Sequence, residues 1–288
     1  MNSVLENSNM NPTFVFIDGS YFSYYRYFSI LSWWKRAYPD TKLDDPYTNN
    51  IFVEKYKKTF VESVKEIPKK LNISRRDRPI LIVGKDCKRE EIWRQELCKN
   101  NDLFKGEYKG NRKNNSENGF MGGPFIRMGY QDNLFVEGGV KAILDHPKLE
   151  ADDCIAISVK YVLEKYPNAR IYIITSDKDY LQLAETRVEI YNLMYQKLTE
   201  QKSSTGNSDC DLFCKTIMGD PSDNILSVLK KCGPKKALKC YKNREYFAEQ
   251  MKKENAYEMY ELNKKLVDFN EIPQVLINEF LDMIKKNK

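Results

Sequence analysis

The sequence predicts an α/β protein with a mostly parallel central sheet, helices on both of its faces, and a helical C-terminal region. Three observations lead to this prediction. Short apolar runs of strand length alternate with helical patterns over the first 200 residues. The strand signals stop at the polar stretch 201–209, QKSSTGNSD. The chain has 288 residues, of which 41% are hydrophobic, and this suffices for a full core.

Four apolar runs bounded by polar or turn residues predict the strands of the sheet. They are 13–19 (TFVFIDG), 79–84 (PILIVG), 170–176 (RIYIITS) and 188–193 (VEIYNL). Residues 52–71 and 150–166 carry apolar side chains at spacings of three and four, which predicts helices between the strands. Residues 105–139 have little periodicity and predict a loop or a mobile helical excursion.

The C-terminal part shows a different pattern. From Leu212 onward the sequence predicts short helices that are broken at Gly219, Gly233 and Pro273. We therefore expect two regions, an α/β domain over 1–200 and a helical region over 201–288.

Composition excludes several classes of protein. No run approaches 18 apolar residues and the N-terminus is polar, so we expect neither a membrane span nor a secretory signal, and hence an intracellular protein. The seven cysteines form no CxxC pair and His146 is the single histidine, so the sequence supports neither a disulfide framework nor a zinc site. We expect free thiols in a reducing compartment.

The net charge of +6 is unevenly distributed. Residues 225–244 hold seven basic side chains and no acidic one, and a second basic region runs from Lys85 to Lys113. This pattern is typical of a surface that binds phosphates.

Carboxylates gather where the predicted strands end. Asp18 ends the first strand, Asp86 follows the second, and Asp177 and Asp179 follow the third. Because the ends of parallel strands lie on one edge of a sheet, where open α/β sheets bind ligands, we expect these carboxylates to lie close together. Two further acidic groups follow in the chain: Glu150, Asp152, Asp153 in LEADD, and Asp220, Asp223 in GDPSDN.

Each acidic motif alone also fits a structural role. Acidic residues are common in a first helical turn, and Asp220 before Pro221 suits a helix N-cap. Their joint occurrence favours a metal site. Hard oxygen ligands without histidine or thiolate suit Mg²⁺ or Mn²⁺, and two such ions can activate a water molecule and stabilise the leaving oxygen of a phosphodiester.

The sequence resembles the flap endonuclease and 5′→3′ exonuclease family, which includes the nuclease domain of bacterial DNA polymerase I and phage exonucleases. The motifs stand in the family's order and span nearly the whole chain: FIDGSYFSYYR (16–26), GKDCKREEIWR (84–94), YKGNR (108–112), EADD (150–153), TSDKDYLQL (175–183) and GDPSDNI (219–225). The chain length and the second motif look most like the versions from large DNA viruses.

The resemblance implies a PIN-like fold with a helical arch near 88–135 and two bound Mg²⁺ ions, for which Mn²⁺ can substitute. The nine acidic residues above match the family's metal-binding carboxylates, some of which act through water. Lys109 and Arg112 match the basic residues that reach the scissile phosphate from the base of the arch, and Tyr108 beside them is a candidate for stacking on a base.

A turn near 219–240 resembles the family's helix–three-turn–helix, which holds one strand of a duplex and in many members binds K⁺. Lys231 replaces the first glycine of its Gly-x-Gly-Pro turn, while Gly233 and Pro234 are kept, so the resemblance leaves K⁺ binding open. Lys235, Lys236 and Lys239 flank the turn at the start of a helix, where free amides favour an anion.

The function implied by the resemblance is a structure-specific 5′ nuclease in DNA replication, recombination or repair, acting on DNA with 5′ flaps, nicks or recessed 5′ ends. We expect it to be a monomer. QVLINEFL (274–281) loosely resembles a sliding-clamp-binding box, but its spacing predicts core packing rather than clamp binding. Two alternatives stay open: a PIN-type or RNase H-like ribonuclease that removes RNA primers from RNA–DNA hybrids, and a structure-specific DNA-binding protein without catalysis.

Overall fold

A five-stranded sheet forms the centre of the computed structural model, which describes residues 11–111 and 120–286. The strands are β1 (Thr13–Asp18), β2 (Ile80–Gly84), β3 (Ala142–Leu144), β4 (Arg170–Ile174) and β5 (Val188–Tyr191). Their order in the sheet is β3-β2-β1-β4-β5, and every neighbouring pair is parallel. The predicted fold class is therefore confirmed, because the described sheet is parallel and helices pack against it.

The sequence prediction missed the edge strand β3. It has only three residues, which is too short for an alternating pattern to show, and it pairs only with β2 among the described strands. The structure also refines the expectation of a loop or helical excursion over 105–139. This range contains two short helices: α4 (Gly123–Gln131), in which two glycines interrupt the apolar spacing, and α5 (Leu134–Glu137), which is too short for a spacing pattern to show.

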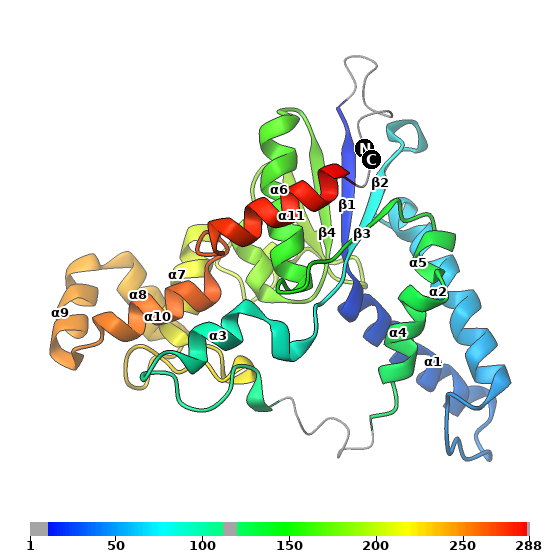
Figure 1. The fold of residues 1–288 in the computed structure, drawn as a ribbon, viewed down its shortest axis with the longest axis horizontal. Coiled ribbons are helices and arrows are strands. Elements are labelled where there is room, and N and C mark those ends of the chain that lie inside the picture. Colours follow the sequence, from blue (N-terminus) through cyan, green and yellow to red (C-terminus); the bar gives the residue numbers. More distant parts are fainter. Residues whose placement is uncertain (1–10, 112–119, 287–288) are drawn as a thin grey trace.

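Helices cover both faces of the sheet (Figure 1). On one face lie α4, α5 and the long helices α1 (Gly19–Ala37) and α2 (Asn50–Lys70), and on the other lie α6 (Ala151–Lys165) and α11 (Gln274–Lys286). Side chains alternate between the two cores along β1, because Phe14 and Phe16 pack against α6 while Val15 and Ile17 pack against α1 and α2.

Four helices form a separate lobe on the side of α6 (Figure 1). They are α7 (Ser208–Met218), α8 (Pro234–Lys242), α9 (Arg244–Glu254) and α10 (Tyr257–Val267), and they share a core that includes Phe213, Leu229, Cys240 and Met251. The chain then returns to the sheet through α11, where Leu276 and Phe280 join the core beneath α6. The core packing predicted for 274–281 is thus confirmed.

The remaining helix, α3 (Trp93–Lys99), lies between the helical lobe and the sheet (Figure 1). Short 3₁₀ turns complete the described chain: η2 (Arg75–Asp77), η3 (Arg89–Glu91), η5 (Lys178–Leu183), η6 (Leu198–Glu200) and η7 (Pro221–Asp223). The seven cysteines are free thiols, as predicted. Among the helices in the described residues, none combines the length and apolarity that crossing a bilayer needs.

Candidate active site

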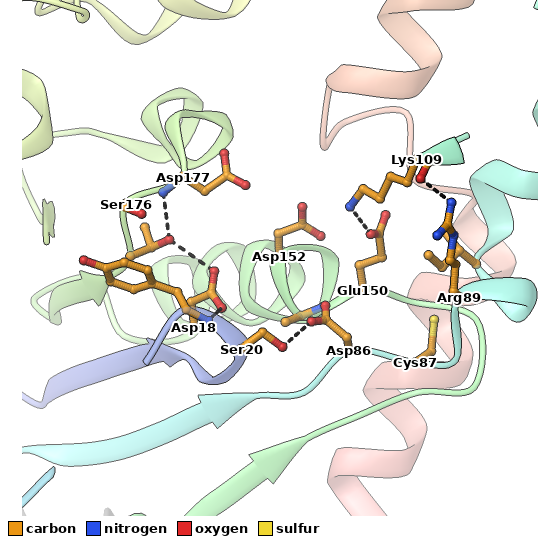
Figure 2. Close-up of a pocket in the computed structure, with 14 residues that line it drawn as sticks. Asp18, Ser20, Asp86, Cys87, Arg89, Lys109, Glu150, Asp152, Ser176 and Asp177 are labelled. Atoms are coloured by element: carbon orange, nitrogen blue, oxygen red, sulfur yellow. Dashed lines mark hydrogen bonds and ion pairs between the residues drawn. The ribbon is translucent and has the colours of Figure 1, made fainter. Parts of the chain in front are cut away.

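A cavity of about 370 Å³ lies at the edge of the sheet where β1, β2 and β4 end. Five of the nine predicted carboxylates line it: Asp18, Asp86, Glu150, Asp152 and Asp177. Figure 2 shows their side chains arranged around one space, with Lys109 and Arg89 on the side away from Asp18 and Asp177. The parallel register brings these residues together, because Asp18 pairs with Gly84, two residues before Asp86, and Ile17 pairs with Ile174, three residues before Asp177.

Asp18 is held by the start of α1, which it caps. Its Oδ1 accepts a hydrogen bond from the amide of Tyr21 at 3.0 Å, and its Oδ2 accepts one from Thr175 Oγ1 at 3.1 Å. Gly19 permits the close approach of α1 to β2, because a Cβ at this position would lie 2.6 Å from the carbonyl oxygen of Gly84. The lack of a Cβ at Gly19 therefore allows Asp18, at the end of β1, and Asp86, just after β2, to face one space.

Asp86 connects the end of β2 to α1 and α6. Ser20 Oγ donates to its Oδ2 at 2.5 Å, and the amide of Ala151 donates to its Oδ1 at 2.9 Å. Because Ala151 is the first residue of α6, this bond fixes the start of the helix that carries Asp152.

Asp177 follows β4 and caps the 3₁₀ turn η5. Its Oδ1 accepts from the amide of Asp179 at 2.9 Å, while its own amide donates to Thr175 Oγ1 at 3.1 Å. Thr175 therefore holds both Asp18 and Asp177, and these carboxylates reach the cavity from neighbouring strands.

Burial and the closeness of neighbouring carboxylates make the ionised forms of several cavity carboxylates unfavourable. Desolvation by burial, and then the negative charge of Asp86, raise the pKa of Asp18 to about 7. Desolvation by burial, and then the negative charge of Asp179, raise the pKa of Asp177 to about 6. Burial, Glu150 and Asp153 raise the pKa of Asp152 as well. A bound cation would remove this unfavourable charge, and the oxygen donors fit a hard divalent ion.

Lys109 lies at the opposite end of the cavity. Its ammonium contacts Glu150 Oε1 and lies 3.8 Å from Asp223 Oδ2. Burial alone would raise the pKa of Glu150, but Lys109 and Arg94 outweigh it and lower the pKa. The backbone of Lys109 is left-handed, with φ of 56°, and its carbonyl accepts a hydrogen bond from Arg89, a lining residue that the sequence did not single out.

A second acidic cluster lies where η5 meets the helical lobe. Oxygens of Asp179, Asp220 and Asp223 all lie within 4.8 Å of one another. Lys215 of α7 contributes an ammonium to this cluster, 2.7 Å from Asp179 Oδ1 and in contact with Asp220 Oδ2. The structure thus brings together residues on both sides of the predicted boundary near residue 201.

Asp153 has a different environment from its neighbour Asp152. It is fully buried and does not line the cavity, and both of its oxygens accept hydrogen bonds from Arg94 at 2.8 Å. Trp93 Nε1 donates to its Oδ2 at 2.9 Å. Because one step along a helix turns a side chain by about 100°, adjacent aspartates face different ways. Asp153 therefore helps to hold α6, but one of its oxygens also lies within 4.8 Å of oxygens of Glu150 and Asp152, so its role as a metal-binding residue stays a prediction.

Tyr108 also differs from the prediction. Its side chain is only 3% exposed, and its hydroxyl lies 3.3 Å from Glu150 Oε2 and 3.4 Å from Asp223 Oδ2. A ring in this position presents no open face to a base, so the interpretation of Tyr108 as a stacking residue is wrong for this conformation. Its buried carbonyl accepts from Gln95 Nε2 at 2.8 Å.

The segment before residue 112 is attached to the turn of the helical lobe. The amide of Lys109 donates to the carbonyl of Asp223 at 3.0 Å, and Asn111 Nδ2 donates to the carbonyl of Pro221 at 3.1 Å. Arg112 lies outside the described residues, as does the middle of the predicted arch. Within 88–135 the described helices are α3, α4 and the beginning of α5.

The predicted duplex-binding turn joins α7 to α8. Gly219 ends α7 with φ of 70°, and a Cβ there would lie 2.5 Å from the carbonyl oxygens of Ile225 and Leu226, so only glycine fits. Gly233 precedes α8 as its N-cap and, having no side chain, makes no side-chain capping bond to the first amides of the helix. Lys231 takes the left-handed conformation, with φ of 50°.

The three lysines of α8 that follow this turn, Lys235, Lys236 and Lys239, have unlike surroundings. Lys235 is exposed. Lys236 Nζ donates to the carbonyl of Lys230 at 2.9 Å and lies 3.4 Å from Glu254 Oε1. Lys239 Nζ lies 3.7 Å from the centre of the Tyr246 ring. Lys236 is thus engaged within the protein, which the sequence pattern did not reveal.

Besides Arg89, two cations near the cavity, Arg94 and Lys215, were not predicted. Arg94 belongs to a motif quoted for its resemblance, but nothing in its local sequence marks it as buried. Lys215 stands between Cys214 and Thr216 in an amphipathic helix, where a lysine is ordinarily solvated. The sequence did contain a signal for the role of Asp153. The Glu150-x-x-Asp153 spacing is that of a capping box, and the structure contains this capping box at the start of α6.

Comparison with solved structures supports the fold. The D15 protein of bacteriophage T5, co-crystallised with metal ions, has 17% sequence identity and a TM-score of 0.59, covering 95% of this chain and 98% of that one. The T5 5′-exonuclease with bound zinc gives 16% identity and a TM-score of 0.61 over the same shares of the two chains. A pseudo-enzyme–product complex of T5 D15 flap endonuclease with DNA and metal ions gives 16% and 0.59.

Comparison with curated protein sequences gives no significant match. The family profile described as 5'-3' exonuclease, N-terminal resolvase-like domain, matches residues 13–209, which is more than half of the chain. That match includes β1, β2, β4 and the five carboxylates of the cavity. The chain therefore belongs to the 5'-3' exonuclease family with the N-terminal resolvase-like domain.

Proposed function

We propose that the protein is a structure-specific 5′ nuclease, acting as a 5′→3′ exonuclease and a 5′-flap endonuclease that hydrolyses DNA phosphodiesters. The observation that carries this proposal is the convergence of five carboxylates on one cavity at the ends of three parallel strands. Membership of the 5'-3' exonuclease family agrees with it.

The two acidic groups would hold two divalent ions, which we propose to be Mg²⁺. Asp18, Asp86, Glu150, Asp152 and Asp177 supply oxygens from the cavity, and Asp179, Asp220 and Asp223 supply oxygens beside it. Ions bound there would activate water and stabilise the leaving oxygen. The observation favouring such ions is the convergence of these carboxylates on one space; burial, and then the neighbouring carboxylates, raise the pKa of Asp18 and Asp177, and a bound cation would offset both effects.

The remaining residues act by position and charge. Lys109 reaches the cavity from the segment before residue 112, so its ammonium can contact a phosphate that enters between the carboxylates. The start of α8 presents amides without a side-chain cap beside exposed Lys235, which suits a phosphate of the duplex strand. The two surfaces would hold a substrate on both sides of a cleavage point, as expected for DNA with 5′ flaps, nicks or recessed 5′ ends.

From the form of the second motif we infer that this member comes from a large DNA virus, with a role in replication, recombination or repair. We infer a monomer that binds DNA without a sliding clamp, since the segment resembling a clamp-binding box is packed in the core.

A panel of end-labelled substrates tests the proposal. Single-turnover cleavage with Mg²⁺ is measured for the wild type and for Asp177→Asn. The substrates are 5′-flap, nicked, blunt and single-stranded DNA and an RNA–DNA hybrid. We expect flap and nicked DNA to be cut fastest, and Asp177→Asn to lose nearly all cleavage while keeping or strengthening DNA binding, because it removes charge that repels phosphates. Preferred cutting of the hybrid would instead favour a ribonuclease, and binding without cutting by the wild type would favour a non-catalytic DNA-binding protein.

A further inference from the structure

Arg94 is a fully buried cation that lies outside the cavity. It belongs to the first turn of α3, and its side chain is only 2% exposed. Its guanidinium lies 4.5 Å from the centre of the Trp93 ring. A charged group in such a place loses its hydration, so its contacts must compensate for that loss.

The contacts of Arg94 connect three elements. NH1 and NH2 donate to the two oxygens of Asp153 at 2.8 Å each, and NH1 lies 3.2 Å from Glu150 Oε2. Nε donates to the carbonyl of Leu266, at the end of α10, at 2.9 Å. One guanidinium therefore joins α3, the start of α6 and the helical lobe.

The hydrogen bonds from Arg94 determine where the carboxylates at the start of α6 point. Glu150 is the N-cap of α6, and Asp153 completes its capping box by accepting from the amide of Glu150 at 3.3 Å. Asp152 lies between these two residues, and its Oδ1 accepts from the amide of Asp153 at 2.7 Å. Fixing Asp153 from outside the cavity thus fixes the turn that presents Glu150 and Asp152 into it.

The helical lobe is attached to the same network. Asn263 of α10 donates from Nδ2 to the carbonyl of Thr216 in α7 at 2.9 Å and to that of Leu226, within the α7–α8 turn, at 2.7 Å. Three residues later in α10, Leu266 accepts from Arg94. The proposed duplex-binding turn and the first turn of α6 are therefore held by the same helix.

We propose that Arg94 is a positioning residue, which sets the geometry of Glu150 and Asp152 for binding divalent cations by clamping the first turn of α6 against α3 and α10. The inference rests on the proposed function, because it concerns the same carboxylates. A buried ion network is weak evidence for stability, since apolar side chains of similar volume often stabilise a core as well or better. Its value here is geometric, because only the planar fork of a guanidinium can donate to both oxygens of Asp153 at once.

The test replaces Arg94 with lysine and measures Mn²⁺ binding in the absence of DNA, using the electron paramagnetic resonance signal of free Mn²⁺. Lysine keeps the charge but cannot make the paired bonds to Asp153. We expect Mn²⁺ affinity to fall by about 10-fold or more, as for other groups that orient metal ligands. Thermal melting in EDTA shows whether the variant is folded.

Arg187→Lys is the matched control. Arg187 NH1 donates to the carbonyl of Pro167 at 2.8 Å and lies 3.5 Å from that of Leu163, so it holds the opposite end of the same helix. The same substitution there should leave Mn²⁺ affinity unchanged.

Trp93→Phe provides a second, uncharged variant in case Arg94→Lys does not fold. It removes the indole N–H bonded to Asp153 and keeps an aromatic ring beside the guanidinium, so we expect several-fold weaker Mn²⁺ binding. If the folded Arg94→Lys protein bound Mn²⁺ with wild-type affinity, the inference would be overturned. If Arg94→Lys does not fold, wild-type Mn²⁺ affinity in Trp93→Phe would overturn it. An equal loss in Arg187→Lys would also overturn it, because the effect would then follow general loosening of α6. If the wild type bound no Mn²⁺ at millimolar concentration, the proposed function itself would fail.

Discussion

Lys215 lies between two carboxylates that come from opposite sides of the boundary between the α/β domain and the helical region. Its ammonium is 2.7 Å from Asp179 Oδ1, and it also contacts Asp220. Burial would lower the pKa of Lys215, but Asp179 and Asp220 outweigh it and raise the pKa above its ordinary value. Lys215 therefore stays charged and neutralises part of the second acidic cluster.

Replacing Lys215 with methionine should make this cluster more negative. We expect the free energy of unfolding in EDTA to fall by about 1–3 kcal/mol, since a largely buried pair is broken. We also expect a larger increase in melting temperature on adding Mg²⁺ than for the wild type, because tighter ion binding stabilises the folded state. Lys197→Met, which breaks the more exposed pair with Glu189, is the control. A Mg²⁺ response equal to that of the wild type would contradict an ion site at this cluster.

Removing the ammonium of Lys109 should affect the chemical step more than binding. Lys109→Ala is expected to lower the single-turnover rate by more than ~10²-fold, as when a charge that stabilises a transition state is lost. Duplex affinity should change little, because one lysine among many basic residues is removed. Rapid-quench kinetics at saturating enzyme measure the rate, and an effect confined to affinity would mean that Lys109 only attracts the substrate.

The raised pKa values of Asp18 and Asp177 predict how the metal-free protein responds to pH. Both carboxylates have higher pKa values in the folded chain, about 7 and about 6, than the ordinary 3.8. Their protonation favours the folded state, so this stability is complete below pH 4 and is lost as pH rises through 6 and 7. In EDTA, the contribution of these groups should lower the melting temperature between pH 5 and pH 8.

The variant Asp18→Asn separates this contribution from that of the other titrating groups. It cannot ionise, so its melting temperature should fall less between pH 5 and pH 8 than that of the wild type. Saturating Mg²⁺ should also reduce the fall in the wild type. An identical pH profile for Asp18→Asn would show that this carboxyl does not titrate in that range.

The lysines at the start of α8 should behave differently from one another. Lys235→Ala should make log K for duplex binding less steep in log salt by about 0.9, the value for one lost phosphate contact. Lys236 is bonded to the carbonyl of Lys230 and paired with Glu254, so Lys236→Ala should mainly loosen the turn and lower the melting temperature. Fluorescence anisotropy over a salt series distinguishes the two effects, and equal slopes for wild type and Lys235→Ala would remove that side chain from the DNA path.

Sequence patterns predicted the parts of this molecule that depend on local spacing. The strands β1, β2, β4 and β5 each have an apolar run with a polar boundary, and the carboxylates after three of them were placed at one edge by the geometry of parallel sheets alone. The three-residue strand β3 has no such run. Asp152 and Asp153 show a further limit, because the direction of adjacent side chains depends on how the helix is rotated against its neighbours.

Contacts between distant segments account for the rest. Arg94 meets Glu150 and Asp153 across more than fifty residues of sequence, and Lys215 meets Asp179 across more than thirty. Neither local periodicity nor composition encodes which cation will face which carboxylate. The burial of Tyr108 has the same origin, because its partners Glu150 and Asp223 come from α6 and η7.

The attachment of the segment before residue 112 to η7 has a consequence for how the chain could be divided. A protease that cut within 201–207 would separate two fragments in sequence, yet the bonds from Lys109 to Asp223 and from Asn111 to Pro221 would still cross between them. Arg94 and Leu266 would add another link. The cut protein should therefore elute as one species under native conditions. A fragment made as residues 1–200 alone would lack Lys215, Asp220 and Asp223, and so could not assemble the second acidic cluster.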